Sequence, residues 1–210
     1  MKIDRIYTGL FRILVPFEDL TTTVYVARLR EGVAIIDSSS SPSDCDEYVV
    51  PALSELGIEP CEVKWLLLTH GHRDHSGGLC RLCRLFPGAT VGAFSELDIP
   101  GYTPIRDGDL IGGELLVLHL PGHTRDSLGF FDTRSRTLLS GDSLQLLGIG
   151  KYRNGIGYPR LYVASVKKLM KMDIHRIVAA HEYDPLGSVA EGHEAVLRYL
   201  ELCIDHCPTY

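Results

Sequence analysis

The chain has no apolar run long enough to span a lipid bilayer, and its first residues contain no apolar core of the signal-peptide type. These two absences predict a cytoplasmic protein without a membrane partner. Positive charge is also scarce, because 21 lysines and arginines stand against 27 aspartates and glutamates, giving a formal net charge of −6 at pH 7. General nucleic-acid binders carry a basic balance, so we expect no nucleic-acid partner.

Cysteine is sparse and is not arranged as a disulfide framework or a zinc ribbon. The six cysteines include one C-x-x-C pair, Cys80 and Cys83, in a segment that we predict to be helical, and a second pair, Cys203 and Cys207, one helical turn apart. A cytosolic chain of 210 residues can bury a sizeable core without crosslinks. We therefore interpret the thiols as structural or solvent-facing, and we predict a single domain over residues 1–210.

What the sequence does contain is a dense group of potential metal ligands. Three histidines and one aspartate fall within six residues, as His70, His72, Asp74 and His75. Neutral imidazoles and carboxylates are the usual ligands of hard or borderline divalent metal ions. Alternate residues of an extended chain point to the same side, so His70 and His72 can bind one ion as a pair. His75 points away from that face, and the spacing therefore favours two metal ions along one loop.

A second group of candidate ligands is spread over the later part of the chain. His123, Asp142 and His181 each come after a predicted strand, and each follows a small residue. Active sites of layered α/β proteins are commonly built where strand ends feed loops. We therefore expect seven candidate ligands, delivered by four strand ends, to converge on one edge of the fold.

The chain alternates between strand and helix patterns. Strands followed by helices occur twice, which predicts helices stacked outside two central sheets. The predicted elements are strands at 24–30, 32–37 and 63–69, helices from 42 to about 56 and at 78–86, strands at 90–93, 115–120, 128–131 and 137–139, a helix at 161–172, a strand at 175–180 and a helix at 188–202.

Taken together, these motifs resemble the metallo-β-lactamase superfamily. The resemblance covers about residues 22–185 and implies an α/β fold, a four-layer αββα sandwich with a pair of metal ions at one edge. The residues that carry it are His70-x-His72-x-Asp74-His75, Pro121-Gly122-His123-Thr124, Ser140-Gly141-Asp142 and Ala180-His181-Glu182-Tyr183, together with Asp37 at the end of its strand.

The resemblance also implies a division of the ligands between the two ions. The first ion would be bound by His70, His72 and His123, and the second by Asp74, His75 and His181, with Asp142 bridging the two. The ligand set contains nitrogen and oxygen only, which favours zinc, with iron or manganese as alternatives.

Two carboxylates have further expected roles. Asp74 would orient the attacking nucleophile and accept a proton afterwards. Asp37 would hold a ligand imidazole by its other nitrogen, with a plain helix cap before Pro42 as the alternative interpretation.

Within the superfamily, the chain is most similar to the glyoxalase II-like thioesterases. Gly150-Lys151-Tyr152 follows the bridging aspartate, and His181-Glu182-Tyr183 matches that group's His-Glu-Tyr motif. The resemblance implies that Lys151, Tyr152 and Tyr183 contact the substrate, whereas a solvated surface loop is the alternative for Lys151 and Tyr152. Few residues follow the last motif in this sequence, so we do not expect the helical domain that usually follows it in that group, which leaves glutathione specificity open.

We therefore predict a metal-dependent hydrolase that uses a metal-bound hydroxide on a small-molecule thioester or ester. One alternative is a mono-iron sulfur dioxygenase of the persulfide dioxygenase type, with His70, His123 and Asp142 as the facial set of ligands. Another is a lactonase with Tyr152 or Tyr158 near the lactone carbonyl. A non-enzymatic metal-binding module is the remaining alternative. No feature of the sequence indicates an oligomeric state.

Overall fold

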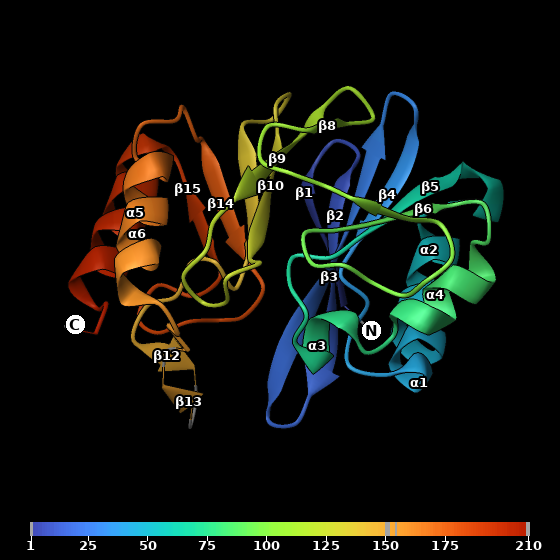
Figure 1. The fold of residues 1–210 in the computed structure, drawn as a ribbon, viewed down its shortest axis with the longest axis horizontal. Helices are drawn as coiled ribbons and strands as arrows, with labels where there is room; N and C mark the ends of the chain where they lie inside the picture. Colours follow the sequence, from blue (N-terminus) through green and yellow to red (C-terminus); the bar gives the residue numbers. More distant parts are fainter. Residues whose placement is uncertain (1, 150–151, 154, 209–210) are drawn as a thin grey trace. The chain divides into compact units, whose positions relative to one another are not determined.

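The computed structural model describes residues 2–149, 152–153 and 155–208, and these residues form two compact units. The N-terminal unit comprises Met1–Ile105 and Leu110–Glu114, and the C-terminal unit comprises Arg106–Asp109 and Leu115–Tyr210. Each unit contains a β-sheet and its own helices (Figure 1). The single domain that we expect over residues 1–210 stays a prediction.

The sheet of the N-terminal unit has seven strands that follow one another in chain order. The first four pair antiparallel, and the last four, from β4 to β7, pair parallel. The strands are β1 (Lys2–Tyr7), β2 (Leu10–Phe17), β3 (Leu20–Leu29), β4 (Gly32–Ile36), β5 (Val63–Leu67), β6 (Thr90–Ala93) and β7 (Tyr102–Pro104).

Short helices and turns connect the parallel strands of this unit. Ser41 caps the first helix, since its side chain accepts a hydrogen bond from the backbone N–H of Asp44 at 3.2 Å. The elements are α1 (Pro42–Asp44), the π-helical turn η1 (Cys45–Val49), α2 (Val50–Glu55), the 3₁₀ turn η2 (Pro60–Glu62), α3 (Arg73–Ser76) and α4 (Leu79–Leu85), followed after β7 by the short strand β8 (Leu110–Ile111). The helix predicted to end near residue 56 therefore forms, with a π-helical turn inside it.

The core of the N-terminal unit lies between the sheet and these helices. It is built from buried aliphatic side chains of the strands, such as Val24, Ile35 and Leu66, packed against Val49 and Leu82 from the helical segments. Burying a side chain of this size stabilises a fold by about 1.5–3 kcal/mol. The hydrophobic contacts fix the C-terminal end of β5, from which the histidine-rich loop emerges.

Two features of this sheet differ from the sequence-based expectation. The hairpin of β1 and β2 was not predicted, because charged residues interrupt its apolar pattern. The guanidinium of Arg12 is buried and donates to Asp4 on the neighbouring strand at 2.9 Å. The strand predicted at 63–69 is shorter in the structure, because β5 ends at Leu67, and its residue Lys64 is exposed.

The sheet of the C-terminal unit contains five strands of that unit in the order β15-β14-β11-β10-β9. Only β11 and β14 pair parallel, and the other neighbours pair antiparallel. The strands are β9 (Leu115–His119), β10 (Leu128–Asp132), β11 (Thr137–Gly141), β14 (Arg176–Ala179) and β15 (Val189–Glu191), and a separate hairpin is formed by β12 (Gly148–Ile149) and β13 (Tyr152–Arg153).

Two longer helices, α5 (Pro159–Leu169) and α6 (His193–Asp205), lie together against this sheet (Figure 1). Buried residues such as Tyr162 and Tyr199 form a core with the sheet. The last helix was predicted to begin at residue 188, but β15 occupies that position, since Ala190 is buried between two exposed neighbours in the alternating pattern of a strand.

None of the helices that the structure describes combines the length and apolar character needed to cross a bilayer.

Candidate metal centre

The N-terminal unit carries four of the candidate ligands on the segment that follows β5. His70 is buried three positions after the end of β5, and His72 occupies the position before the first turn of α3. Asp74 and His75 belong to α3, where His75 is fully buried. A strand end followed by one helical turn thus gathers all four side chains, which we call the histidine-loop set.

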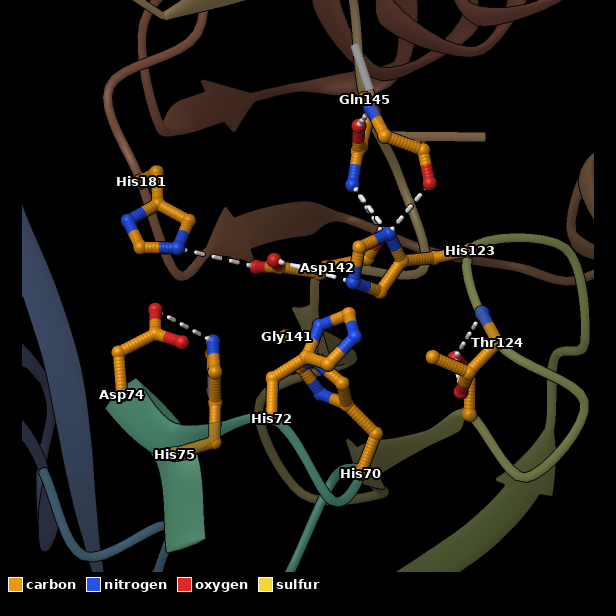
Figure 2. A network of polar contacts seen from close by, with 12 residues as sticks. His70, His72, Asp74, His75, His123, Thr124, Gly141, Asp142, Gln145 and His181 are labelled. Atoms are coloured by element: carbon orange, nitrogen blue, oxygen red, sulfur yellow. Dashed lines mark hydrogen bonds and ion pairs between the residues drawn. The ribbon is translucent and has the colours of Figure 1, made fainter. Parts of the chain in front are cut away.

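The four side chains of the histidine-loop set lie close to one another. His70 Nε2 is 3.0 Å from His72 Nδ1, and the rings of His70 and His75 are 4.2 Å apart between centroids. Asp74 Oδ2 is 3.2 Å from His75 Nε2, as Figure 2 shows. Three imidazoles and one carboxylate therefore point their nitrogen and oxygen atoms into one small region of this unit.

Asp37 contacts the histidine-loop set through its side-chain carboxylate. Its buried carboxylate accepts a hydrogen bond from the backbone N–H of Thr69 at 2.8 Å and lies 2.7 Å from His75 Nδ1. A carboxylate accepts a hydrogen bond, so this contact favours the proton on Nδ1 and the lone pair on Nε2, the form of an imidazole that binds a metal ion through Nε2. The cap of helix α1 is Ser41, so Asp37 lies at the imidazole and not at the helix.

The approach of Asp37 depends on an unusual backbone. Asp37 and Ser39 have φ values of 65° and 62°, in the left-handed region that side chains seldom adopt. Ser38 holds this turn, because its backbone N–H donates to the carbonyl of His75 at 2.6 Å. A Cβ atom on Gly78 would lie 2.1 Å from the Ser38 carbonyl oxygen, so only glycine fits there.

The C-terminal unit carries the other three candidate ligands on three different strand ends. His123 follows β9, Asp142 comes directly after β11, and His181 follows β14. Asp142 Oδ2 lies 3.5 Å from His123 Nε2, and Asp142 Oδ1 lies 3.4 Å from His181 Nε2 (Figure 2). Each oxygen of this mostly buried carboxylate thus faces a different imidazole. We call these three residues the strand-end set.

Gln145 also belongs to this region, although it was not singled out from the sequence. Its side-chain amide nitrogen lies 2.9 Å from His123 Nδ1. In the sequence, it is marked only as a polar residue between two leucines, Leu144 and Leu146, which the structure shows to be fully buried. A buried amide of this kind requires hydrogen-bond partners, and this requirement could have drawn attention to it.

Tyr183 is fixed within the C-terminal unit beside His181. The tyrosine is 3% exposed, and its ring meets the ring of His181 edge-on with centroids 5.8 Å apart. Burial, with the negative charge of Asp142 as a further cause, raises the pKa of Tyr183 well above its usual value, so the side chain stays a neutral phenol. The structure thus places this expected substrate contact in the interior of its unit.

The two other expected substrate contacts cannot be placed in the same way. Lys151 lies outside the described residues, and Tyr152 belongs to β13, but its side chain is outside the described part of the chain.

The chemistry of both donor sets fits a metal ion. Each set mixes imidazole nitrogen with carboxylate oxygen, which suits zinc, iron or manganese. His75 in the first set is already held at Nδ1, as a metal-binding histidine usually is. Neither set alone supplies three ligands for each of two ions plus a bridging carboxylate.

Comparison with sequence families gives one match, which extends over both donor sets. The profile of the metallo-beta-lactamase superfamily matches residues 18–101 and 92–181.

Curated relatives include enzymes with a printed activity. A hydroxyacylglutathione hydrolase of Stenotrophomonas maltophilia is 37% identical over 153 residues, covering 70% of this chain and 58% of the relative. A hydroxyacylglutathione hydrolase of Photobacterium profundum is 34% identical over 138 residues, covering 63% of this chain and 53% of the relative. The chain thus spans between about half and three-fifths of the length of these relatives.

Solved structures resemble the whole chain. A metallo-beta-lactamase family protein from Thermus thermophilus has a TM-score of 0.74 at 22% identity, covering 96% of this chain and 80% of that one. A flavo di-iron protein from Thermotoga maritima has a TM-score of 0.74 at 18% identity, covering 97% of this chain and 60% of that one. At these identities the likeness concerns the fold alone, and it confirms the predicted α/β fold class.

Proposed function

Because the chain belongs to the metallo-β-lactamase superfamily, we propose that it is a metal-dependent hydrolase of a small-molecule thioester or ester. The observation that carries the proposal is the placement of Asp142 between two imidazoles, with one oxygen toward each. The relatives named hydroxyacylglutathione hydrolase support the thioester as the substrate class. This chain spans little more than half of their length, so the proposal does not extend to the glutathione part of the substrate.

The two donor sets would serve one centre with two divalent ions. Two considerations support this assignment. The strand-end set provides a carboxylate, Asp142, whose two oxygens face different imidazoles. The matched family profile also extends over both sets. The residues that would hold the first ion are His70, His72 and His123, those that would hold the second are Asp74, His75 and His181, and Asp142 would be shared.

When bound, two divalent cations would lower the pKa of a water molecule and polarise a substrate carbonyl, which is the chemistry that hydrolysis near neutral pH requires. The protein's own contribution is orientation. Asp37 Oδ2 lies 2.7 Å from His75 Nδ1, and a hydrogen bond between these two atoms fixes the orientation of the ring. Thr22 donates to the backbone carbonyl of Asp74 at 3.2 Å, which fixes the helical turn that carries both residues.

Asp74 is the proposed catalytic carboxylate. Its side chain keeps 14% of its surface exposed, unlike that of the fully buried His75 next to it. It can therefore accept a hydrogen bond from the attacking water and take the proton afterwards, which is worth about 10²–10⁴-fold in rate for a well-placed general base. Lys151 and Tyr152 remain proposed substrate contacts, and zinc remains the proposed metal.

The test is metal analysis of the purified protein combined with a substrate panel of acyl thioesters, esters and lactones. Two zinc ions per chain with thioester or ester cleavage would support the proposal. One iron per chain with oxygen uptake on a persulfide would favour the sulfur dioxygenase instead. Lactone cleavage alone would favour the lactonase, for which the partly exposed Tyr158 is available. Metal-loaded protein that cleaves none of these substrates would contradict the proposal.

A further inference from the structure

The C-terminal unit contains a buried polar network centred on Gln145, a residue that is 2% exposed. A side-chain amide offers two N–H donors and one carbonyl acceptor, and each needs a partner when water is excluded. The contacts of Gln145 extend from the core tyrosine Tyr162 to the candidate ligand His123. The network therefore connects the packed interior of the unit with the strand-end set.

Tyr162 anchors the backbone of Gln145. Its phenol oxygen accepts a hydrogen bond from the Gln145 N–H at 2.8 Å, and its O–H donates to the Gln145 carbonyl at 2.6 Å. Burial raises the pKa of Tyr162 well above its usual value, so the phenol keeps the proton that the second bond requires. Because the fully buried Tyr162 fixes both the N–H and the carbonyl of Gln145, the backbone from which the Gln145 side chain extends is held in place.

The Gln145 side chain in turn holds the loop at Gly155. Its carbonyl oxygen accepts a hydrogen bond from the Gly155 N–H, and its amide nitrogen donates to the backbone carbonyl of Asp142 at 3.3 Å. The Gly155 carbonyl is thereby placed 2.7 Å from His123 Nδ1. A Cβ atom on Gly155 would lie only 3.1 Å from His123 Nδ1, so the close approach of this loop suits glycine.

Two contacts at His123 Nδ1 favour opposite neutral forms of the ring. A backbone carbonyl can only accept, so the 2.7 Å contact with Gly155 favours the proton on Nδ1. The Gln145 amide nitrogen, 2.9 Å from the same Nδ1, favours the form with the proton on Nε2. Both contacts depend on Gln145, because its side chain also accepts from the Gly155 N–H, so this residue controls which groups surround His123 Nδ1.

We propose that Gln145 is a positioning residue for His123. By holding Gly155, it places the backbone carbonyl that contacts Nδ1 and so fixes the orientation of the imidazole, with Nε2 toward the Asp142 carboxylate. The consequence for catalysis rests on the proposed function, whereas the effect on the imidazole and on metal affinity can be measured without a substrate.

The test is Gln145→Met, which keeps the side-chain length and loses the polar contacts of the amide with Gly155, Asp142 and His123. We expect metal affinity, measured by competition with a chelator, to fall by about 10–100-fold, the usual effect of removing a partner that orients a metal ligand. We also expect ¹⁵N NMR of the imidazoles in metal-free protein to show a different proportion of the two neutral forms of His123 in the variant than in the wild type.

The control is Ser135→Ala, which removes a buried hydrogen bond to Thr137 in the same unit. It should change neither the metal affinity nor the spectrum of His123. If Gln145→Met folds normally and keeps both the wild-type affinity and the wild-type ¹⁵N spectrum of His123, the positioning role is wrong. If the wild type binds metal but cleaves no substrate, the proposed function fails, and the inference about Gln145 still stands or falls on affinity and NMR.

Discussion

The two units supply metal ligands in different ways. In the N-terminal unit, one loop and one helical turn carry four donors within six residues, His70 to His75. In the C-terminal unit, the ends of β9, β11 and β14 each carry one donor. The first arrangement depends on local backbone geometry, and the second depends on the register of a whole sheet. The comparison predicts that the two sets will respond differently to substitution.

The largest effect should come from removing a ligand in either unit. We expect Asp142→Ala and His72→Ala to abolish activity and to reduce bound metal. Loss of a ligand should lower activity by more than about 100-fold, because even the loss of an outer hydrogen-bond partner costs about 10–100-fold. If the shared-carboxylate role is right, Asp142→Ala will lose more metal than His72→Ala in elemental analysis.

The matched control for the histidine variant is His193→Ala, on an exposed residue at the start of α6. It should keep full metal content and activity. Full metal content in both Asp142→Ala and His72→Ala would contradict the ligand assignment.

The sequence predicts the two donor sets to different extents, because one set lies on a single loop and the other on three separate strand ends. His70 to His75 stand out without any structure, because their spacing alone predicts convergence. Asp142 and His181 look like ordinary residues after strands until the resemblance assigns them a role. Their convergence depends on the pairing of β11 with β14, in which Gly141 lies opposite Ala179.

Other features could not be predicted because they depend on contacts between distant residues. Gln145 lies in a glycine-rich stretch without periodicity, and its partners Tyr162 and His123 are 17 and 22 positions away. The β1–β2 hairpin was missed since Arg12 and Asp4 interrupt its apolar pattern and are neutralised only by pairing. Local patterns thus predict the elements, and pairing across the chain decides the rest.

The next largest effect concerns the residues that orient an imidazole in each unit. Asp37→Asn should weaken metal binding by about 10–100-fold, as expected for Gln145→Met in the other unit. Asp37→Asn should also lower the free energy of unfolding by about 1–3 kcal/mol, because Asp37 is buried and holds both Thr69 and His75. Chelator competition and urea unfolding of the metal-free protein measure the two effects separately. If Asp37→Asn and Gln145→Met lower the free energy of unfolding equally, the orienting residues of the two units do not differ in their effect on stability.

A moderate effect is expected from filling the space at Gly78. In Gly78→Ala, the new methyl group would lie 2.1 Å from the Ser38 carbonyl oxygen and 2.3 Å from Cys45 Sγ. The turn that carries Asp37 would have to shift, so we expect a loss of about 1–3 kcal/mol in stability and weaker metal binding. Gly88→Ala is the control, since nothing lies within 4 Å of its Cβ position. Urea unfolding that is equal for both variants would show that the turn is not tightly packed.

The smallest expected effect is a loss of folding stability at alkaline pH. It can be compared between one buried thiol of each unit. Burial raises the pKa of Cys45 in the N-terminal unit to about 11 and that of Cys203 in the C-terminal unit to about 12, from an ordinary value of 9.0. Between pH 9 and these values the unfolded chain loses the thiol proton while the folded chain keeps it. The unfolded state therefore binds fewer protons, and stability falls as pH rises.

Stability should thus be unaffected by these thiols below about pH 9 and should fall by up to about 1.4 kcal/mol per pH unit and per thiol above it. Cys203→Ala should flatten the decline in urea unfolding up to about pH 12, and Cys45→Ala should flatten it only up to about pH 11. The exposed Cys61 provides the control, because Cys61→Ala should leave the slope unchanged. If all three variants keep the wild-type slope, the alkaline loss does not originate in the buried thiols, and the two cores do not differ in this respect.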